Sequence, residues 1–385
     1  MLVITLIGAT TAFFGASVGL VTNDLKRIIA MSTISQLGYM VLAIGLSQYN
    51  VALLHTLGHS FFKALLFLAA GSVIHSLADQ QDIRKMGGLI KFLPVTYTVM
   101  LIGSLSLLAT PWLTGFYSKD LILELAYGAY SFSGIYAFIL GSITAGLTAF
   151  YSFRLISLVF LTVPNGSKTT YTNTHEANLL VIIPLVLLSM FSIFFGYIFS
   201  DLFVGVGSDF LGNSLYINPN NISIVEAEFS LPLFIKLLPA LLSLLGSIIA
   251  IYLYHINPEF IIGLTKTKLG RRIYTVLNSK YLFDTIYNKY IITLGLKIGY
   301  TISKVLDRGV IELVGPYGLS STLNKTALSI AKSDNRLIST YSTYIIFNAL
   351  CLIFIIFAPI LISSSLLFEI RLIIIYIAAS IYVLS

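Results

Sequence analysis

The chain has 385 residues, of which 57% are hydrophobic and 10% are charged, whereas roughly a quarter of the residues of a soluble domain are charged. This composition excludes a soluble globular fold and predicts an all-α polytopic membrane protein. The one cysteine, Cys351, lies in an apolar run, which excludes an intrachain disulfide and leaves no cysteine cluster for zinc or iron-sulfur ligation.

Apolar runs long enough to cross about 30 Å of hydrocarbon predict about eight membrane spans, one of them broken. They cover residues 2–21, 28–47, 51–75, 93–127 (interrupted), 132–162, 178–200, 232–254 and 340–366. The first run lacks the basic segment and the cleavage site of a signal peptide, so we expect a retained helix.

The connections between these spans alternate in charge. Lysine and arginine gather in every second connection, at Lys26 and Arg27, at Arg84, Lys85 and Lys91, at Lys168, and from Lys266 to Arg336. The other connections have neither, and the longest of them holds Asp201, Asp209, Glu226 and Glu228. The positive-inside rule places the basic loops on the cytoplasmic or matrix side. The net charge of +7 therefore reflects the basic loops on one side of the membrane. No nucleic-acid partner is expected.

The first connection and the second span carry a group of polar residues. Asn23 and Asp24 are placed to cap the second helix, and Lys26 follows in its first turn. This pattern favours a basic turn that sets the topology. The hydroxyls and the amide on the early turns of the span either satisfy helix packing or hold waters of a proton wire; they belong to Ser32, Thr33, Ser35 and Gln36.

The third span, from Val51 to His75, carries titratable residues in an otherwise apolar helix. His55, His59 and Lys63 recur every four residues and therefore share one helix face. A charged lysine near the middle of a bilayer costs roughly 2.5–3.5 kcal/mol, so it needs a partner, a protein interior or a hydrated cavity. Because histidine titrates near neutral pH and a buried lysine can release its proton, the pattern favours a proton or ion path.

Two other interpretations of these three residues stay open. The two histidines could bind a metal, but the span offers no nearby carboxylate or cysteine, and Lys63 adds a cation one turn on; we predict no metal site. The histidines could also be satisfied core residues beside a snorkelling lysine.

The fourth span should break. Pro111 removes a backbone donor and Gly115 relaxes the helix, which predicts an interruption from Thr110 to Gly115. Lys119, Asp120 and Glu124 follow this break. Broken helices at membrane depth mark ion sites in transporters, although an ordinary loop at a helix end is the alternative. In the next span, Arg154 is a candidate counter-ion without a partner that the sequence identifies.

Residues 256–336 are too polar for a span. Twelve basic and five acidic residues alternate with apolar ones at helical spacing, which predicts a long amphipathic helix on the membrane surface, interrupted near Gly315 and Pro316. The apolar runs after it predict an anchoring span and a tail that begins near Glu369 and Arg371.

Five blocks of the sequence, in order, resemble a known family: TNDLKRIIAMSTISQLGYM, LLHTLGHSFFKALLF, GSVIHSLADQQDIRKMGGL, TPWLTGFYSKDLILE and KYLFDTIYNKYI. They are similar to the subunit 5 family of NADH:ubiquinone oxidoreductase, respiratory complex I, of mitochondrial and fungal type. Subunit 5 in turn resembles the large subunits of multisubunit sodium/proton antiporters. The resemblance covers essentially the whole chain apart from about the last twenty residues.

The resemblance implies a distal proton-pumping module of the membrane arm. It assigns Lys63 as the central lysine of the second half-channel, His55 and His59 to its water-linked relay, and Lys119 with Asp120 to the exit at the broken helix. The auxiliary candidates are Asp24, Lys26, Glu124 and Arg154. Residues 256–336 would form the lateral helix on the matrix side, anchored by the last span.

The family's core consists of two inverted half-repeats, and this sequence starts at the second. We therefore expect the second half-repeat at 1–165, additional transmembrane helices at 166–255, the lateral helix segment at 256–336, and the anchor and tail at 337–385. The acidic residue and the lysine of the first half-repeat are expected in a longer form of the chain or in another chain. Without them the usual complete proton path is not expected.

The resemblance thus implies a subunit of an H⁺-translocating NADH:ubiquinone reductase in the mitochondrial inner membrane. We expect no redox centre, cofactor or metal in this chain, and NAD, FMN, iron-sulfur clusters and ubiquinone in other subunits. The expected partners are other membrane-arm subunits, including neighbouring antiporter-like ones, and lipid such as cardiolipin. The alternatives are a subunit of a sodium/proton antiporter and a structural element of the membrane arm.

Overall fold

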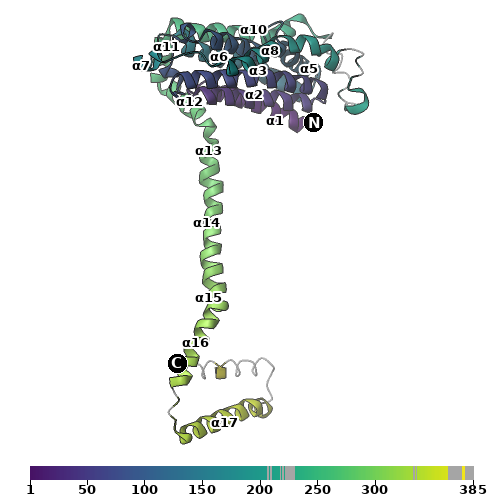
Figure 1. Cartoon of the computed structure of the whole chain (residues 1–385). Coiled ribbons are helices and arrows are strands. Elements are labelled where there is room, and N and C mark those ends of the chain that lie inside the picture. The colour runs from purple at the N-terminus through teal and green to yellow at the C-terminus, as the bar shows by residue number, and fades with distance from the viewer. Residues whose placement is uncertain are drawn as a thin grey trace. The chain divides into compact units, whose positions relative to one another are not determined.

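The computed structural model describes residues 1–205, 208, 210–216, 218, 221, 230–332, 334, 336–362 and 375–377. Three acidic residues of the longest connection without lysine or arginine, Asp209, Glu226 and Glu228, lie outside the described residues. So do Glu369 and Arg371, where the predicted tail begins. The regular elements in the described part of the chain are helical (Figure 1). Contacts divide the chain into two units, Met1–Phe283 and Asp284–Ser385, which are described separately.

The first unit is a helical bundle in which α1, α2, α3 and α6 run side by side (Figure 1). Its α-helices are α1 (Leu2–Gly19), α2 (Leu25–Gly45), α3 (Tyr49–Ser76), α4 (Pro94–Leu108), α5 (Leu121–Gly128), α6 (Phe132–Ile156), α7 (Lys168–Thr172), α8 (Leu179–Val204), α10 (Leu233–Ile251), α11 (Pro258–Lys266) and α12 (Lys268–Asn278). Shorter 3₁₀ or π turns are η1 (Ile83–Lys85), η2 (Leu89–Lys91), η3 (Phe116–Asp120), η4 (Ser157–Leu161), η5 (Gly212–Ser214), η7 (Tyr252–Ile256) and η8 (Lys280–Leu282).

By length and composition, seven helices in the described part of the chain could cross a membrane. They are Leu2–Gly19, Leu25–Gly45, Tyr49–Ser76, Phe132–Leu161, Leu179–Val204, Leu233–Ile256 and Ile338–Ile356. Each falls on a predicted span, and the remaining predicted span, 93–127, falls on α4, η3 and α5. The prediction of a polytopic all-helical membrane fold is confirmed.

Helices α1 and α2 pack with their backbones in close contact. A Cβ atom on Gly8 would lie 2.5 Å from the backbone nitrogen of Leu42, and one on Gly38 would lie 2.4 Å from that of Ala12. Small residues permit this approach, which is how membrane helices associate without a hydrophobic driving force. This packing fixes the rotation of α2 about its own axis, and with it the direction of the face that carries Ser32 and Gln36.

The fourth span breaks where the sequence predicts. Helix α4 ends at Leu108, and Ala109 and Trp112 adopt positive φ angles of 68° and 69°. A Cβ atom on Gly115 would lie 1.9 Å from the carbonyl oxygen of Ser106, so only glycine fits there. The chain then resumes as the π turn η3, a form of helix that often accompanies functional sites.

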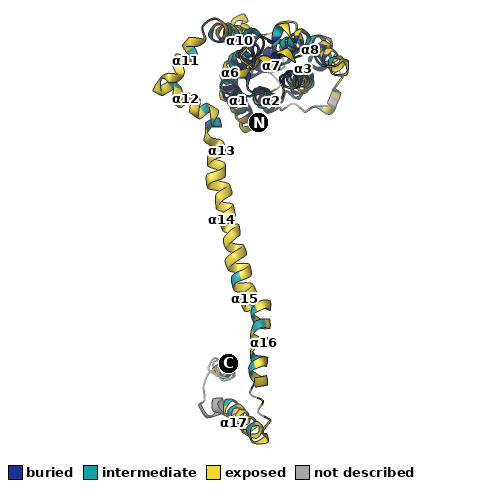
Figure 2. Cartoon of the chain, turned by 60° about the vertical axis from the view of Figure 1, so that its left-hand side comes forward, coloured by how far each residue is buried: buried dark blue, intermediate teal, exposed yellow. Residues whose placement is uncertain are grey.

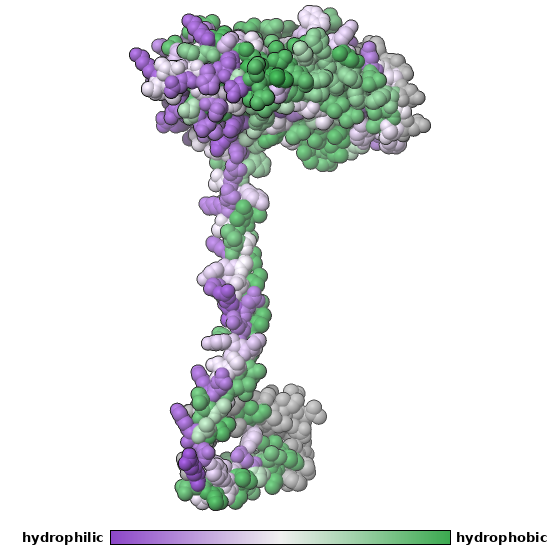
Figure 3. All heavy atoms as spheres, viewed as in Figure 1, coloured by the Kyte–Doolittle hydropathy of each residue, from purple (hydrophilic) through white to green (hydrophobic). Residues whose placement is uncertain are grey.

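Polar residues gather at one end of the bundle. In Figure 3, the hydrophilic colour covers the end where α7, α11 and α12 lie, and apolar residues cover the adjoining surface. The connections 20–24, 77–93 and 162–167 and residue Asn257 reach this end. We call it the basic end because it carries Lys26, Arg84, Lys85 and Lys168. Buried residues concentrate inside the bundle (Figure 2).

The amphipathic segment is less continuous than predicted. Besides the expected interruption at Gly315, it breaks at Thr267, and a left-handed turn follows in which Lys280, Tyr281 and Leu282 have φ angles of 51°, 56° and 63°. The Tyr281 hydroxyl donates to Ser17 Oγ at 2.9 Å, so this turn packs on α1. The part of the segment before Asp284 therefore belongs to the first unit.

The second unit begins within a helical run. That run comprises α13 (Phe283–Ile286), η9 (Tyr287–Ile292), α14 (Thr293–Thr301), η10 (Ile302–Ile311) and α15 (Glu312–Val314), and α16 (Pro316–Lys332) and α17 (Ile338–Ile362) follow. Apolar and polar side chains lie on opposite sides of the run (Figure 3), and nearly all its residues are exposed (Figure 2). Its placement along a membrane surface stays a prediction.

Candidate functional site

The three titratable residues of α3 are buried in the bundle. His55, His59 and Lys63 are 1%, 8% and 4% exposed. Lys63 Nζ donates to Ser32 Oγ, and His55 Nε2 lies 3.2 Å from Gln36 Oε1. Because Ser32 and Gln36 both belong to α2, the titratable face of α3 is directed at the polar face of α2.

His55 connects this face with the broken helix. Its Nδ1 atom lies 2.9 Å from Ser118 Oγ in η3. With Gln36 Oε1 as the acceptor, Nε2 carries the proton of the neutral ring and Nδ1 is an acceptor. The Ser118 hydroxyl reaches both this nitrogen and, at 3.5 Å, the Gly115 carbonyl. The broken helix therefore contacts α3 through Ser118, the residue immediately before Lys119.

His59 lies between His55 and Lys63. The ring centres of His55 and His59 are 6.2 Å apart, and His59 Nε2 has no hydrogen-bond partner among the described residues. A polar connection across this gap would need a bridging group such as water. His55 and His59 are therefore neighbours on one face of α3, and their role as a relay stays a prediction.

Lys119 is buried at the broken end of α4. Its Nζ atom donates to Thr148 Oγ1 of α6 at 3.1 Å and to the Leu107 carbonyl at 3.5 Å, and it lies 5.5 Å from the centre of the Tyr39 ring. Leu107 is in the last turn of α4, where unpaired carbonyls favour a cation. The break thus creates a binding position for an ammonium group inside the bundle.

The remaining predicted site residues divide into two places. Asp120 is buried beside Lys119, and Glu124 is half-buried one turn further along α5. Asp24 and Lys26 instead lie at the basic end. Asp24 occupies the N-cap position of α2, but its side chain caps no backbone group and pairs with exposed Arg27 at 3.1 Å.

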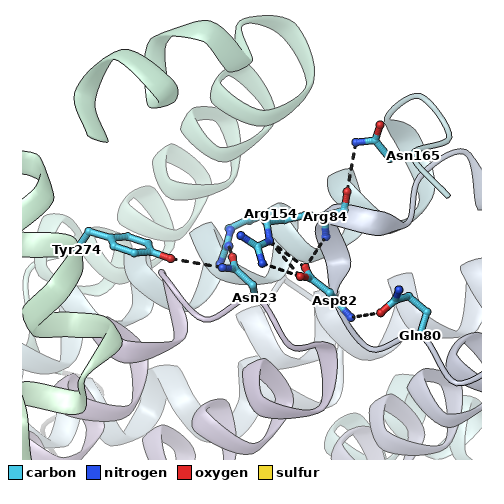
Figure 4. Close-up of polar contacts among 7 residues, drawn as sticks. All are labelled: Asn23, Gln80, Asp82, Arg84, Arg154, Asn165 and Tyr274. Carbon is cyan, nitrogen blue, oxygen red and sulfur yellow. Dashed lines mark hydrogen bonds and ion pairs between the residues drawn. The ribbon is translucent and has the colours of Figure 1, made fainter. Parts of the chain in front are cut away.

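Arg154 also lies at the basic end, apart from the two buried lysines. Its guanidinium donates to the carbonyls of Leu20 at 2.7 Å and Thr22 at 2.8 Å, and to Asn23 Oδ1 at 2.7 Å. Its partners are thus mainly the unpaired carbonyls at the end of α1 and in the turn after it. The Asn23 side chain continues to the Tyr274 hydroxyl of α12 at 3.4 Å (Figure 4).

An ion pair orders the adjacent loop of the basic end. Arg84 Nη2 lies 2.6 Å from Asp82 Oδ2, and Asn165 donates to the Arg84 carbonyl at 3.2 Å (Figure 4). The hydrogen bonds from Arg84 hold the pKa of the Asp82 carboxyl below its ordinary value. Backbone hydrogen bonds from Ile83 N to the Asn23 carbonyl and from Leu25 N to the Gln81 carbonyl, both 3.0 Å, join this loop to the α1–α2 turn.

Several contacts of the site could not be expected from the sequence. Ser118 and Thr148 hold His55 and Lys119, and Asn23 holds Arg154. Their only signal is a hydroxyl or amide in an apolar or turn setting. Likewise, Glu176 accepts from the backbone nitrogens of Val95 and Thr96 at 2.7 and 3.3 Å, so a loop carboxylate caps α4 from a distant part of the sequence.

The site has no arrangement typical of a metal centre. Among the residues that the structure describes, no group of three or more histidine, cysteine, aspartate or glutamate side chains could hold a metal ion. What the structure brings together is a set of amines, imidazoles and hydroxyls. Such groups can accept and release protons.

Comparisons with known proteins identify the family and the fold of the chain. Residues 1–148 match the family described as NADH:quinone oxidoreductase/Mrp antiporter, TM, and residues 214–358 match the NADH dehydrogenase subunit 5 C-terminus. The fold also resembles a chain in the structure of the Mrp complex from Dietzia sp. DQ12-45-1b, with a TM-score of 0.50 and 20% identity over 86% of this chain and 34% of that one. This likeness concerns the fold alone.

Close relatives are chains 5 of NADH-ubiquinone oxidoreductases. The protein of Schizophyllum commune is 67% identical over 377 residues, which are 98% of this chain and 55% of that protein. The protein of Mycosarcoma maydis is 61% identical over 355 residues, 92% of this chain and 53% of that one. The chain therefore spans about half the length of the curated relatives it matches.

The family match over residues 1–148 places this chain in the class of antiporter-like membrane subunits. Within that class, the chain belongs to the subunit 5 family of NADH:ubiquinone oxidoreductase. The resemblance of the five sequence blocks is confirmed.

Proposed function

We propose that the chain is a proton-translocating membrane-arm subunit of NADH:ubiquinone oxidoreductase. The observation that supports this most is the buried polar series from Lys63 through the two histidines and Ser118 to Lys119. Ionisable residues within membrane spans are costly and serve as proton relays. The family of the chain supplies the reaction to which the relay would be coupled.

In this proposal a proton enters the series at Lys63 and leaves it at Lys119. His59 and His55 pass it through intervening water, and Ser118 carries the connection into the broken helix. Asp120 and Glu124 follow toward the end of the bundle opposite the basic end and would guide release. Asp24, Lys26 and Arg154 have no direct contact with the series and serve the structure of the basic end.

The chain itself would carry no electrons. Oxidation of NADH and reduction of ubiquinone, with FMN and iron-sulfur clusters, would take place in other subunits. A conformational or electrostatic signal from that reaction would change the proton affinity of Lys63. Neighbouring antiporter-like subunits of the membrane arm would be its partners.

The proposed location is the mitochondrial inner membrane, with the basic end on the matrix side. The charge of the basic loops supports this orientation. The amphipathic segment 256–336 would be the lateral helix on the matrix side of the membrane, where its basic residues suit anionic lipids such as cardiolipin. The helix α17 would anchor it.

Replacement of Lys119 with methionine tests this function. In the assembled enzyme, we expect fewer protons moved per NADH oxidised, because the variant removes the only amine at the broken helix, while NADH oxidation with an uncoupler persists. The measurement is proton uptake in vesicles, with exposed Lys85→Met as the control. Unchanged pumping would refute the role of Lys119, loss of assembly alone would favour a structural element, and sodium-dependent transport without NADH would favour an antiporter.

A further inference from the structure

The helix that carries Lys119 resumes directly against α8. Helical conformation begins again at Thr114, whose side chain is buried, with 2% of the residue exposed. The Thr114 hydroxyl donates to the Phe191 carbonyl of α8 at 3.0 Å and accepts from the Gly196 amide at 3.0 Å. One side chain thus binds a backbone acceptor and a backbone donor that lie 77 and 82 residues later in the chain.

This contact is not the usual one for a threonine in an apolar helix. Threonine hydroxyls there donate to a carbonyl three or four residues earlier in their own helix, as those of Thr5 and Thr144 do. A threonine at a helix start more often caps that helix. Among the described residues, the Thr114 hydroxyl binds only α8. Its hydrogen bonds therefore join two parts of the bundle.

Glycines on both sides leave room for Thr114. A Cβ atom on Gly196 would lie 2.6 Å from Thr114 Cα, and one on Gly58 of α3 would lie 2.7 Å from the Thr114 methyl group. Gly58 stands between His55 and His59 on α3. Thr114 thus fits between α3 and α8 because both helices lack a side chain at the contact.

A second hydroxyl attaches the other side of the break to α8. Ser106, in the last turn of α4, donates to the Ser192 carbonyl at 3.1 Å. Ser192 and Gly196 are four residues apart, so Ser106 and Thr114 bind the same turn of α8. Both ends of the break are therefore held by one turn of a single helix.

Helix α8 is in turn packed on α3 (Figure 1). The Phe61 ring of α3 lies 4.9 Å from the Phe191 ring and 5.0 Å from the Phe195 ring. Phe191 is also the residue whose carbonyl accepts from Thr114. The same turns of α8 therefore contact α3 through their aromatic rings and the broken helix through their backbone.

We propose that Thr114 is a positioning residue for proton transfer between α3 and the broken helix. Ser118 and Lys119 follow it by four and five residues, about one helical turn further on, and Ser118 contacts His55. Because α8 holds the start of this turn, it also fixes where Ser118 and Lys119 lie relative to α3. The inference rests on the proposed function and adds α8 to the elements that build its site.

Two threonine variants of the assembled enzyme test this role. Thr114→Val keeps the shape of the side chain but leaves the Phe191 carbonyl and the Gly196 amide without their partner, whereas Thr114→Ser keeps the hydroxyl. We expect proton flux through this subunit to fall roughly tenfold in Thr114→Val, less than the roughly 100-fold that about 1 Å of misplacement can cost, since Ser106 still binds α8. In Thr114→Ser we expect the flux to stay near that of the unaltered enzyme.

The measurement is protons moved per NADH oxidised in vesicles, with the uncoupled rate of NADH oxidation beside it. Thr5→Val is the matched control. Thr5 is 1% exposed, and its methyl group also lies against a glycine, Gly45. Its hydroxyl, however, donates within its own helix, to the Leu2 carbonyl at 2.7 Å. We expect full pumping in this control.

The combination of Thr114→Val with Lys119→Met separates positioning from general damage to the bundle. A residue that acts through Lys119 causes no further loss once the amine is absent. Full pumping in Thr114→Val, equal losses in Thr114→Val and Thr114→Ser, or a loss that adds to that of Lys119→Met overturns the proposal. If Thr114→Val does not assemble, Thr114→Ala takes its place with the same readouts, because alanine also removes the hydroxyl and cannot crowd Gly58.

The same variants distinguish failure of this inference from failure of the proposed function. Normal pumping in Lys119→Met would refute the proposed function. Loss of pumping in Lys119→Met together with full pumping in Thr114→Val would overturn only the positioning role of Thr114.

Discussion

Replacing Lys63 with methionine is expected to lower proton flux through this subunit by roughly 100-fold, the size of effect that loss of a proton-transferring group typically has. Lys63 lies at one end of the buried series, and Ser32 is its direct partner. Methionine is similar in length, so it fills the space without an amine. The measurement is the proton-to-NADH ratio in vesicles, together with the uncoupled rate of NADH oxidation.

The stability of this variant separates a functional role from a structural one. Burying a charge that lacks an ionic partner is costly, and methionine of similar length removes that charge. We therefore expect Lys63→Met to assemble and to unfold at or above the temperature of the unaltered protein. Exposed Lys289→Met is the control for removal of one positive charge. Retention of the full proton ratio in Lys63→Met would show that Lys63 carries no protons.

The variant Arg154→Met should have the opposite profile, with a large loss of stability. Without the guanidinium, the carbonyls of Leu20 and Thr22 and the amide oxygen of Asn23 lose their donor. Each unsatisfied buried acceptor costs about 1–3 kcal/mol, so the loss for these three acceptors should be about 3 kcal/mol or more. Thermal unfolding and the yield of assembled enzyme measure it.

Two further arginine variants make this prediction specific. Arg154→Lys should fall between the unaltered protein and Arg154→Met, because an ammonium cannot reproduce the planar fork that contacts three acceptors. Arg27→Met should cost about 1 kcal/mol or less, because its pair with Asp24 is exposed. Equal stability of Arg154→Met and the unaltered protein would contradict the assignment of Arg154 to the basic end.

The sequence was sufficient for features that depend on local chemistry. Apolar runs of bilayer length predict the spans, and spacing by four predicts the shared face of His55 and Lys63. Pro111 and Gly115 predict the break, because one lacks a backbone donor and the other alone fits against Ser106. The break in turn accounts for the buried position of Lys119.

The sequence was not sufficient where a side chain binds a distant backbone. Arg154 binds carbonyls more than 130 residues earlier in the chain, and every helix end has such carbonyls. The same holds for Glu176, whose partners are amides at the start of α4. The left-handed turn at Lys280 and Tyr281 lacks glycine and asparagine, so the usual sequence signal for positive φ is absent.

The most direct test of the account combines Lys63→Met and Lys119→Met in one enzyme and measures protons moved per NADH oxidised. Residues that act in series on one path give non-additive losses. We predict that the double variant has the same residual proton ratio as either single variant, since both lysines belong to one route. A double variant whose loss equals the sum of the two single losses would contradict a single path through Lys63 and Lys119.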